Sequence, residues 1–349
     1  MSTDQSPILS IAIPTWNRAT YLAETLKQLT SELRSVNQPT VEILVSDNGS
    51  TDKTSEVIDR CHHEGLKLTS IRNSENIGSD ANIAQCFNLA KGKYVLILGD
   101  DDVFVDGGLK ALLDLLEKND YGVVCMRSYS FDSDFSKEHP GGEGAPQFFE
   151  NVDNFFKKLG PLITLISVCV INKELLPDVD ASVFCGSNLV QVHLVARAAI
   201  AAKRNVFFNR YLIACKRNNS GGYSFSKIFV ANFFGIMETY IGSRFTEKGL
   251  KNLESRMMLG FYPFYLYKMR VYGDNELTKR DRLIYEKRFK GRWQYEMVLA
   301  PILSWPRPFA VFWGALSTLL GRIAQGDFRR GCAFAINKMR QALGAGSEV

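Results

Sequence analysis

Short apolar runs and longer amphipathic segments alternate along the first 126 residues of the chain. The short runs predict β-strands at 8–13, 41–45, 66–72, 94–98 and 121–126. Between them, apolar residues recur every three or four positions, which predicts helices at 20–33, 81–90 and 109–116 and another that ends near residue 61. Strands that alternate with helices of this length are typical of right-handed βαβ units. We therefore expect an α/β fold with a mostly parallel sheet and flanking helices.

This alternation ends near residue 127. Residues 131–147 are rich in Gly, Pro and acidic residues and predict a loop, whereas 162–171 and 206–215 predict extended structure and 187–202 predicts a helix. A polar loop follows at 217–223, and the pattern beyond 225 is helical. We expect three regions: 1–127, 128–224 and a C-terminal helical region at 225–349.

Composition and charge indicate a globular protein with one strongly basic part. The chain has 349 residues, of which 46% are hydrophobic and 23% are charged. Residues 242–349 hold 19 Lys and Arg against 9 Asp and Glu, whereas residues 1–241 hold 23 against 28. The basic third therefore predicts a surface with a partner of its own. No RNA- or DNA-binding motif accompanies it, so nucleic acid is not the expected partner.

The start of the chain and its cysteines predict a cytoplasmic protein. Residues 1–6 are polar and lack the basic and apolar parts of a signal peptide. The seven cysteines are scattered without CxxC spacing. We expect reduced core residues and neither a disulfide framework nor a zinc site.

The most apolar part of the basic third is 309–320, with Arg307 and Arg322 at its flanks. It is shorter than the ~18–20 apolar residues that a membrane-spanning helix needs. Basic flanks around such a run suit a helix that lies in a membrane interface. A helix buried in an ordinary C-terminal bundle fits the same pattern.

Three consecutive carboxylates, Asp100, Asp101 and Asp102, follow the predicted strand at 94–98. Adjacent carboxylates repel one another, and a divalent metal bound through oxygen is an economical source of compensating charge. Ligands of α/β sheets bind outside the carboxyl ends of the strands, which is where this triplet lies. The alternative is a solvated acidic turn before the helix that follows Gly107.

Four predicted strands are each followed by a polar loop, at 14–18, 46–52, 72–80 and 99–102. Such loops converge on one edge of a doubly wound sheet. Together they offer hydrogen-bonding groups for a base and a ribose, a cation for phosphate and carboxylates for a metal. This set suits a nucleoside diphosphate site, although the chain has neither a Walker motif nor a GxGxxG loop.

Four motifs in this order resemble family 2 glycosyltransferases, which have the Rossmann-like GT-A fold. They are Ser10-Ile-Ala-Ile-Pro-Thr-Trp-Asn-Arg18, Glu42-Ile-Leu-Val-Ser-Asp-Asn-Gly-Ser-Thr-Asp52, Arg72-Asn-Ser-Glu-Asn-Ile-Gly78 and Gly92-Lys-Tyr-Val-Leu-Ile-Leu-Gly-Asp-Asp-Asp102. The resemblance is dense over 8–127 and loose over 160–220. Ser-Asp-Asn-Gly-Ser and Leu-Gly-Asp-Asp-Asp are similar to the abequosyltransferase-like enzymes of O-antigen synthesis.

The resemblance implies roles for residues of the four loops. Asp47 would bind the pyrimidine, Arg72 would lie against base or phosphate, and Asp100 and Asp102 would form the DxD pair with Mn²⁺ or Mg²⁺. In the alternative register Asp101 is the metal ligand, so all three carboxylates are metal candidates. The full set expected to bind the nucleotide-sugar is Pro14, Thr15, Asn17, Arg18, Asp47, Asn48, Arg72, Asn76, Asp80, Asp100 and Asp101.

The general base is harder to assign. The resemblance implies an acidic pair at the start of the helix near 187, where this chain has Ser187 and Asn188. His193 is the titratable residue of that segment and is a candidate for the base or for a third metal ligand, with a core histidine as the alternative. His193 and Asp102 are the two catalytic candidates. Asp178 and Asp180 are weaker candidates.

The polar loop after the last predicted strand is the remaining candidate element. Its residues Arg217, Asn218 and Tyr223 are expected to contact the acceptor or to close over the diphosphate, or else to form an ordinary connection.

The expected function is that of a metal-dependent glycosyltransferase, a hexosyl- or deoxyhexosyltransferase of lipopolysaccharide O-antigen synthesis. The resemblance implies a nucleotide-diphosphate sugar as donor and a saccharide, in particular a lipid-linked one, as acceptor. We expect peripheral association with the inner face of the cytoplasmic membrane. The alternative is a noncatalytic GT-A-like protein that binds a nucleotide or acts as a scaffold.

Overall fold

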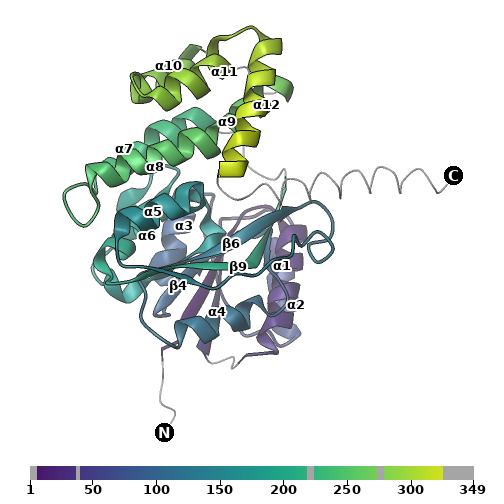
Figure 1. Cartoon of the computed structure of the whole chain (residues 1–349). Helices are drawn as coiled ribbons and strands as arrows, with labels where there is room; N and C mark the ends of the chain where they lie inside the picture. The colour runs from purple at the N-terminus through teal and green to yellow at the C-terminus, as the bar shows by residue number, and fades with distance from the viewer. Residues whose placement is uncertain (1–5, 37–39, 218–223, 273–278, 325–349) are drawn as a thin grey trace, which may run out of the picture. The chain divides into compact units, whose positions relative to one another are not determined.

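The computed structural model describes residues 6–36, 40–217, 224–272 and 279–324. The chain forms two compact units (Figure 1). Unit 1 comprises Met1–Tyr223 and Asn232–Gly249, and unit 2 comprises Ser224–Ala231 and Leu250–Val349.

Unit 1 is built on a nine-stranded mixed sheet with the strand order β3-β2-β1-β4-β8-β6-β9-β5, in which β7 pairs with β9. The parallel pairs are β1 with β2, β1 with β4, β2 with β3 and β6 with β9, and β5, β7 and β8 run against their neighbours. The strands are β1 (Leu9–Thr15), β2 (Val41–Asp47), β3 (Thr69–Arg72), β4 (Tyr94–Ile97), β5 (Asp102–Phe104), β6 (Val123–Phe131), β7 (Gln147–Phe149), β8 (Cys169–Asn172) and β9 (Asn205–Lys216). Six strands therefore share one direction, so the predicted α/β class is confirmed.

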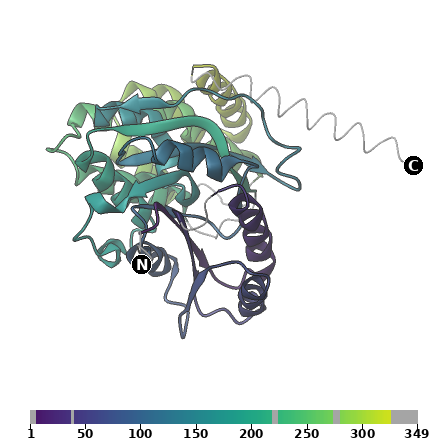
Figure 2. The ribbon, with the colours of Figure 1, turned by 90° about the horizontal axis from the view of Figure 1, so that it is seen from below.

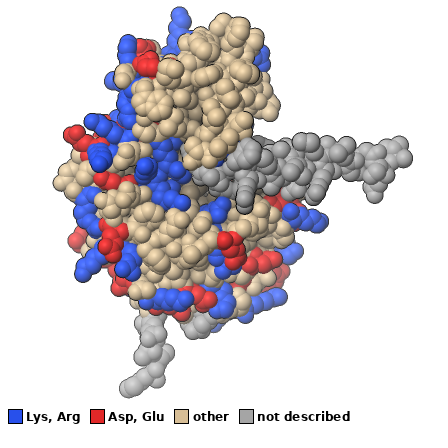
Figure 3. All heavy atoms as spheres, viewed as in Figure 1, with Lys and Arg blue, Asp and Glu red and all other residues tan. Residues whose placement is uncertain are grey.

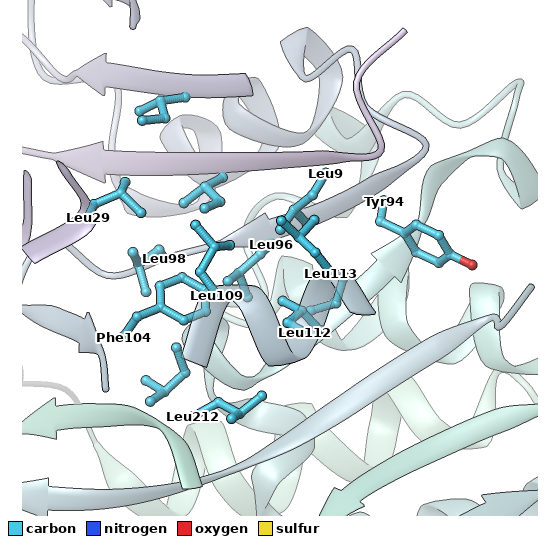
Figure 4. Close-up of a cluster of buried hydrophobic side chains, with 14 of the residues drawn as sticks. Leu9, Leu29, Tyr94, Leu96, Leu98, Phe104, Leu109, Leu112, Leu113 and Leu212 are labelled. Atoms are coloured by element: carbon cyan, nitrogen blue, oxygen red, sulfur yellow. The ribbon is translucent and has the colours of Figure 1, made fainter. Parts of the chain in front are cut away.

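Helices cover both faces of this sheet. Leucines of α1 (Ala19–Leu33) and α4 (Gly108–Leu116) form one large buried cluster with side chains of β1 and β4, such as Leu9 and Leu96 (Figure 4). Helices α1 and α2 (Thr54–His63) lie side by side (Figure 2). On the other face, Cys86 of α3 (Ser79–Leu89) packs against Ala12 and Leu44. Unit 1 also contains α5 (Val152–Leu159), α6 (Val190–Ala201) and α7 (Phe233–Glu238).

The prediction of extended structure over 162–171 was wrong in its first part. The chain forms the short 3-10 helices η2 (Gly160–Thr164) and η3 (Ile166–Val168), and only β8 is extended. A short apolar run does not distinguish a strand from buried helical turns. Pro161 supplies a backbone angle that suits the first turn of a helix and needs no hydrogen-bond acceptor.

The described residues of unit 2 are mostly helical, as the pattern beyond residue 225 predicted. Its helices are α8 (Glu247–Gly260), whose first residues belong to unit 1, α9 (Tyr262–Tyr272), α10 (Lys279–Phe289), α11 (Ala300–Ser304) and α12 (Arg307–Ala324). Tyr262, Tyr285 and Phe289 pack together in its core, and buried Glu254 pairs with Arg288 and Arg292. Among the described helices, none is both long and apolar enough to cross a membrane.

Candidate functional site

The four polar loops follow β1, β2, β3 and β4 and meet at one edge of the sheet. Thr15 at the end of β1 lies opposite Asp47 at the end of β2, and Asp47 lies opposite Arg72 at the end of β3. The parallel register thus brings the ends of these strands together. The convergence that the sequence predicted is confirmed by contacts that join the loops.

The first and fourth loops are joined through Asp100, which is buried. The Thr15 hydroxyl donates a hydrogen bond of 2.7 Å to Asp100 Oδ2, and Arg18 Nε lies 3.2 Å from Asp100 Oδ1. Arg18 Nη2 lies 2.7 Å from Asp101 Oδ2. The Thr25 hydroxyl donates to the backbone carbonyl of Asp100 at 2.9 Å. Arg18 therefore bridges two carboxylates of the acidic triplet and holds the first loop against it.

Asp102 is held by residues far away in the sequence. The Ser167 hydroxyl donates to Asp102 Oδ2 and accepts a 2.9 Å hydrogen bond from the backbone N–H of Gly99. The backbone N–H of Lys216 lies 3.3 Å from Asp102 Oδ1. A 3-10 turn and the end of β9 thus fix the orientation of this carboxylate.

Burial disfavours the charged form of two carboxylates of the triplet. Burial raises the pKa of Asp100 to about 6, although Arg18 and the Thr15 hydroxyl oppose the shift. Burial and the neighbouring charge of Asp101 raise the pKa of Asp102 to about 7, although Ser167 opposes this. A cation placed beside these carboxylates would relieve both costs.

Asp47 is buried and has one oxygen without a hydrogen-bond donor. Its Oδ1 accepts a 2.9 Å hydrogen bond from the backbone N–H of Ser50. Within the described residues no donor makes a hydrogen bond to Oδ2, and Arg72 Nε lies 3.6 Å from it. A buried carboxylate oxygen of this kind is an acceptor suited to an N–H group of a base.

Other residues that were predicted to bind the nucleotide-sugar make hydrogen bonds that join the loops to one another. Asn48 Nδ2 donates to Asn76 Oδ1 at 2.9 Å, and Asn48 Oδ1 accepts from the backbone N–H of Ile77 at 3.0 Å. Asn17 adopts a positive φ of 53°, and its Oδ1 accepts from the backbone N–H of Thr51 at 2.7 Å. Pro14 lies in β1. The nucleotide-sugar contacts of these residues stay predictions.

Asp80 contacts the segment just before α6, and His193 lies in the first turn of that helix. Asp80 Oδ2 accepts 2.8 Å hydrogen bonds from the backbone N–H groups of Gly186 and Asn188. The resemblance implied an acidic pair here, at positions 187 and 188. His193 Nδ1 lies 2.8 Å from the Tyr240 hydroxyl, and its ring stacks on Phe184 with a centroid distance of 4.4 Å.

The charge of His193 is set by its surroundings. Burial, together with Arg197, lowers the pKa of His193, and Asp80 opposes the shift. The imidazole is therefore neutral at neutral pH, which a general base requires.

The loop predicted to cover the site is described only at its start. Arg217 pairs with Asp132 at 2.6 Å and donates to the backbone carbonyl of Ser130. Asn218 and Tyr223 lie outside the described residues. The role of this loop stays a prediction.

Sequence reasoning missed Ser167, Thr25 and Tyr240. Ser167 stands 65 positions from its partner Asp102 and Tyr240 stands 47 positions from its partner His193. Neither residue lies in a motif, and no periodicity links them to their partners. Thr25 lies within the predicted helix, and nothing in the sequence pattern indicated its hydrogen bond to Asp100.

The carboxylates of Asp100, Asp101 and Asp102 are the groups at this edge of the sheet that could hold a divalent metal. Among the described residues, no group of three or more His, Cys, Asp or Glu is arranged to hold a metal by itself. Mg²⁺ is commonly held by one or two carboxylates together with phosphate oxygens of the substrate. Asp100, Asp101 and Asp102 fit that kind of site and do not fit a metal cage made by the protein alone.

Comparison with known proteins gives a consistent family and fold. The model described as glycosyl transferase family 2 matches residues 10–176. Abequosyltransferase RfbV of Salmonella typhimurium is 35% identical over 121 residues, which are 34% of this chain and 36% of that protein. The alignment thus spans about a third of this relative.

Two of the solved structures that are similar to the chain were obtained with a nucleotide-sugar. TarS of Staphylococcus aureus, in complex with UDP-GlcNAc, has a TM-score of 0.57 at 14% identity, over 91% of this chain and 92% of that chain. Mannosyltransferase PcManGT of Pyrobaculum calidifontis, in complex with GDP-Man and Mn²⁺, has a TM-score of 0.53 at 14% identity, over 91% and 87%. At these identities the likeness is one of fold, and it is to GT-A glycosyltransferases. The similarity to glycosyl transferase family 2 extends over residues 10–176, which is slightly less than half of the chain.

Proposed function

We propose that the protein is a glycosyltransferase that takes a sugar from a nucleoside-diphosphate sugar bound at the edge formed by the four loops. The observation that carries this proposal is that buried carboxylates of Asp47, Asp100 and Asp102 lie together at one edge of the sheet. Among the described residues no donor makes a hydrogen bond to the buried Oδ2 of Asp47, and burial raises the pKa of Asp100 and Asp102 because it disfavours their charged forms. A base N–H group would donate a hydrogen bond to Asp47, and the metal ion that accompanies a diphosphate would add positive charge beside Asp100 and Asp102.

The metal is proposed to be Mn²⁺ or Mg²⁺, held by carboxylates of Asp100, Asp101 and Asp102. When bound, such a cation neutralises the charge that develops on the leaving nucleoside diphosphate. Arg18, which pairs with Asp100 and Asp101, keeps these carboxylates together. The relative that was solved with GDP-Man and Mn²⁺ supports this choice of metal.

Transfer requires an acceptor hydroxyl to attack the anomeric carbon while the bond from that carbon to the phosphate oxygen breaks. His193 is the proposed base for the hydroxyl proton. This role needs the tautomer in which Nδ1–H donates to the Tyr240 oxygen, so that Nε2 accepts the proton. Asp80, at the start of α3, is the alternative base, because its carboxylate contacts the segment just before α6.

The proposed acceptor is a saccharide, in particular a lipid-linked one, in the synthesis of a bacterial surface polysaccharide such as O-antigen. The excess of cations over residues 242–349 supports work at the inner face of the cytoplasmic membrane, where anionic lipids attract basic surfaces. The similarity to an abequosyltransferase supports a deoxyhexose or hexose as the transferred sugar.

A noncatalytic nucleotide-binding protein is the second candidate, because Ser187 and Asn188 stand where an acidic pair was expected. One experiment separates the two. UDP-, CDP-, GDP- and dTDP-sugars are titrated with and without Mn²⁺, and nucleotide release is followed with saccharide and lipid-linked acceptors. We expect metal-dependent binding and acceptor-dependent release. Binding without release across all acceptors would favour the noncatalytic protein.

A further inference from the structure

Helix α12 of unit 2 exposes its large apolar side chains and buries its small ones. The exposed fractions of Phe309, Phe312, Leu320 and Ile323 are 64%, 69%, 56% and 50%. Their spacing of three, eight and three residues places them on one side of a helix with 3.6 residues per turn. A helix of a soluble bundle usually turns that side inward, so the exposed face calls for a partner.

The orientation of α12 is fixed by its packing. The opposite side, formed by Ala310, Gly314, Ser317 and Gly321, is buried. A Cβ added at Gly321 would lie 2.2 Å from the carbonyl oxygen of Leu259, and one added at Gly314 would lie 3.1 Å from Cβ of Tyr267. Only small residues fit this close approach. The helix cannot turn its large side chains inward without separating from α8 and α9.

The surroundings of the exposed face identify the chemistry of its partner. Helices α9 and α12 pack on each other and carry Lys268, Arg270, Arg307 and Arg322 but no acidic residue. The Lys268 ammonium and the Arg322 guanidinium lie 5.8 and 5.2 Å from the centre of the Phe264 ring. The surface over α12 is mostly uncharged, with cations at its border (Figure 3). An apolar face with a basic border is complementary to anionic lipid headgroups above acyl chains.

Tryptophan side chains stand beside the same face. Trp305, which is exposed, lies 6.0 Å from Trp313 between ring centres, and Trp313 Nε1 donates to the carbonyl of Met297 at 3.1 Å. Tryptophan is enriched where membrane meets water. A second copy of the chain fits this face less well, because a two-fold contact would bring the basic borders together.

We propose that the face of α12 formed by Phe309, Phe312, Leu316, Leu319, Leu320 and Ile323 enters the headgroup region of a membrane that contains anionic phospholipid, with the helix axis parallel to the surface. The proposal rests on the proposed function only for the membrane at which the protein works. It names the element that binds the lipid.

The test uses the full chain and cosedimentation with vesicles of phosphatidylcholine, with or without phosphatidylglycerol. The double variant Phe309→Ser/Phe312→Ser is expected to weaken partition at least about tenfold, because two exposed aromatic side chains no longer enter the lipid. Val183→Ser/Leu283→Ser is the matched control, since these side chains are exposed by 72% and 61% on other elements, and its partition should equal that of the wild type. Lys268→Gln/Arg322→Gln should lose about tenfold on phosphatidylglycerol vesicles only.

The contradicting results are distinct. Wild-type partition with unchanged binding of the phenylalanine variant overturns the role of α12 and leaves the membrane location standing. Absence of wild-type partition overturns both. Self-association that the same variant abolishes, without an effect on partition, assigns the face to a second copy. Nucleotide binding, measured in parallel by calorimetry, tests the glycosyltransferase proposal independently.

Discussion

Asp100→Asn should stabilise the metal-free protein, and the gain should depend on pH. Asp100 is 4% exposed, and its pKa is raised from 3.8 to about 6. The folded state binds the Asp100 proton more tightly than the unfolded state does. Ionisation of Asp100 therefore lowers the free energy of unfolding as pH rises above the pKa of the unfolded state, and this loss is complete once pH exceeds the pKa of the folded state. Two pKa units correspond to an upper limit of about 3 kcal/mol.

Asparagine keeps the shape of the side chain, accepts from Arg18 and can donate to the Thr15 hydroxyl, which rotates. Allowing for imperfect hydrogen bonds, we expect a gain of about 1–2 kcal/mol at pH 8 that is smaller by about 1 kcal/mol at pH 5. Urea unfolding in EDTA at both pH values measures it. Asp114→Asn on the exposed surface of α4 is the control and should show no pH-dependent gain. If the Asp100→Asn variant is less stable than the wild type at pH 8, the ionised carboxylate stabilises the fold and the expected gain does not exist.

Three further variants test the site. Asp102→Ala should abolish metal-dependent transfer while circular dichroism and thermal unfolding show an intact fold; turnover retained in an Asp101→Ala/Asp102→Ala variant contradicts the assignment. Ser167→Ala removes the donor to Asp102 Oδ2 and should weaken Mn²⁺-nucleotide binding about 10–100-fold by calorimetry, with Ser182→Ala, outside these contacts, as control. Asp47→Ala should weaken binding of UDP about tenfold or more and spare pyrophosphate, which has no base, and an equal loss for both ligands would argue against a contact to the base.

The sequence predicted the parts of the site that follow from strand order. Each polar loop comes directly after an apolar run, and parallel pairing of β1 with β2 and β4 brings those loops together. The contacts between Thr15 and Asp100 and between Arg18 and Asp101 are consequences of that order. Ser167 could not be found in this way, because it lies in a run whose apolar pattern suited a strand and which instead forms 3-10 turns.

The orientation of α12 was likewise beyond the sequence. Residues 309–320 contain no charged side chain, so no polar face indicated which side is exposed. The size of the side chains sets the orientation of α12. Its glycine and serine residues allow the close approach to α8 and α9, and its phenylalanines face outward. Periodicity of hydrophobicity does not record that difference in size.

The most direct test of the central claim is a crystal structure of the full chain with Mn²⁺ and the nucleoside-diphosphate sugar that binds most tightly. We expect a base N–H group within hydrogen-bond distance of Asp47 Oδ2 and a metal ion bound by carboxylates of Asp100–Asp102. A nucleotide bound away from the loops after β1, β2, β3 and β4, or a metal with no ligand from the acidic triplet, would contradict this expectation.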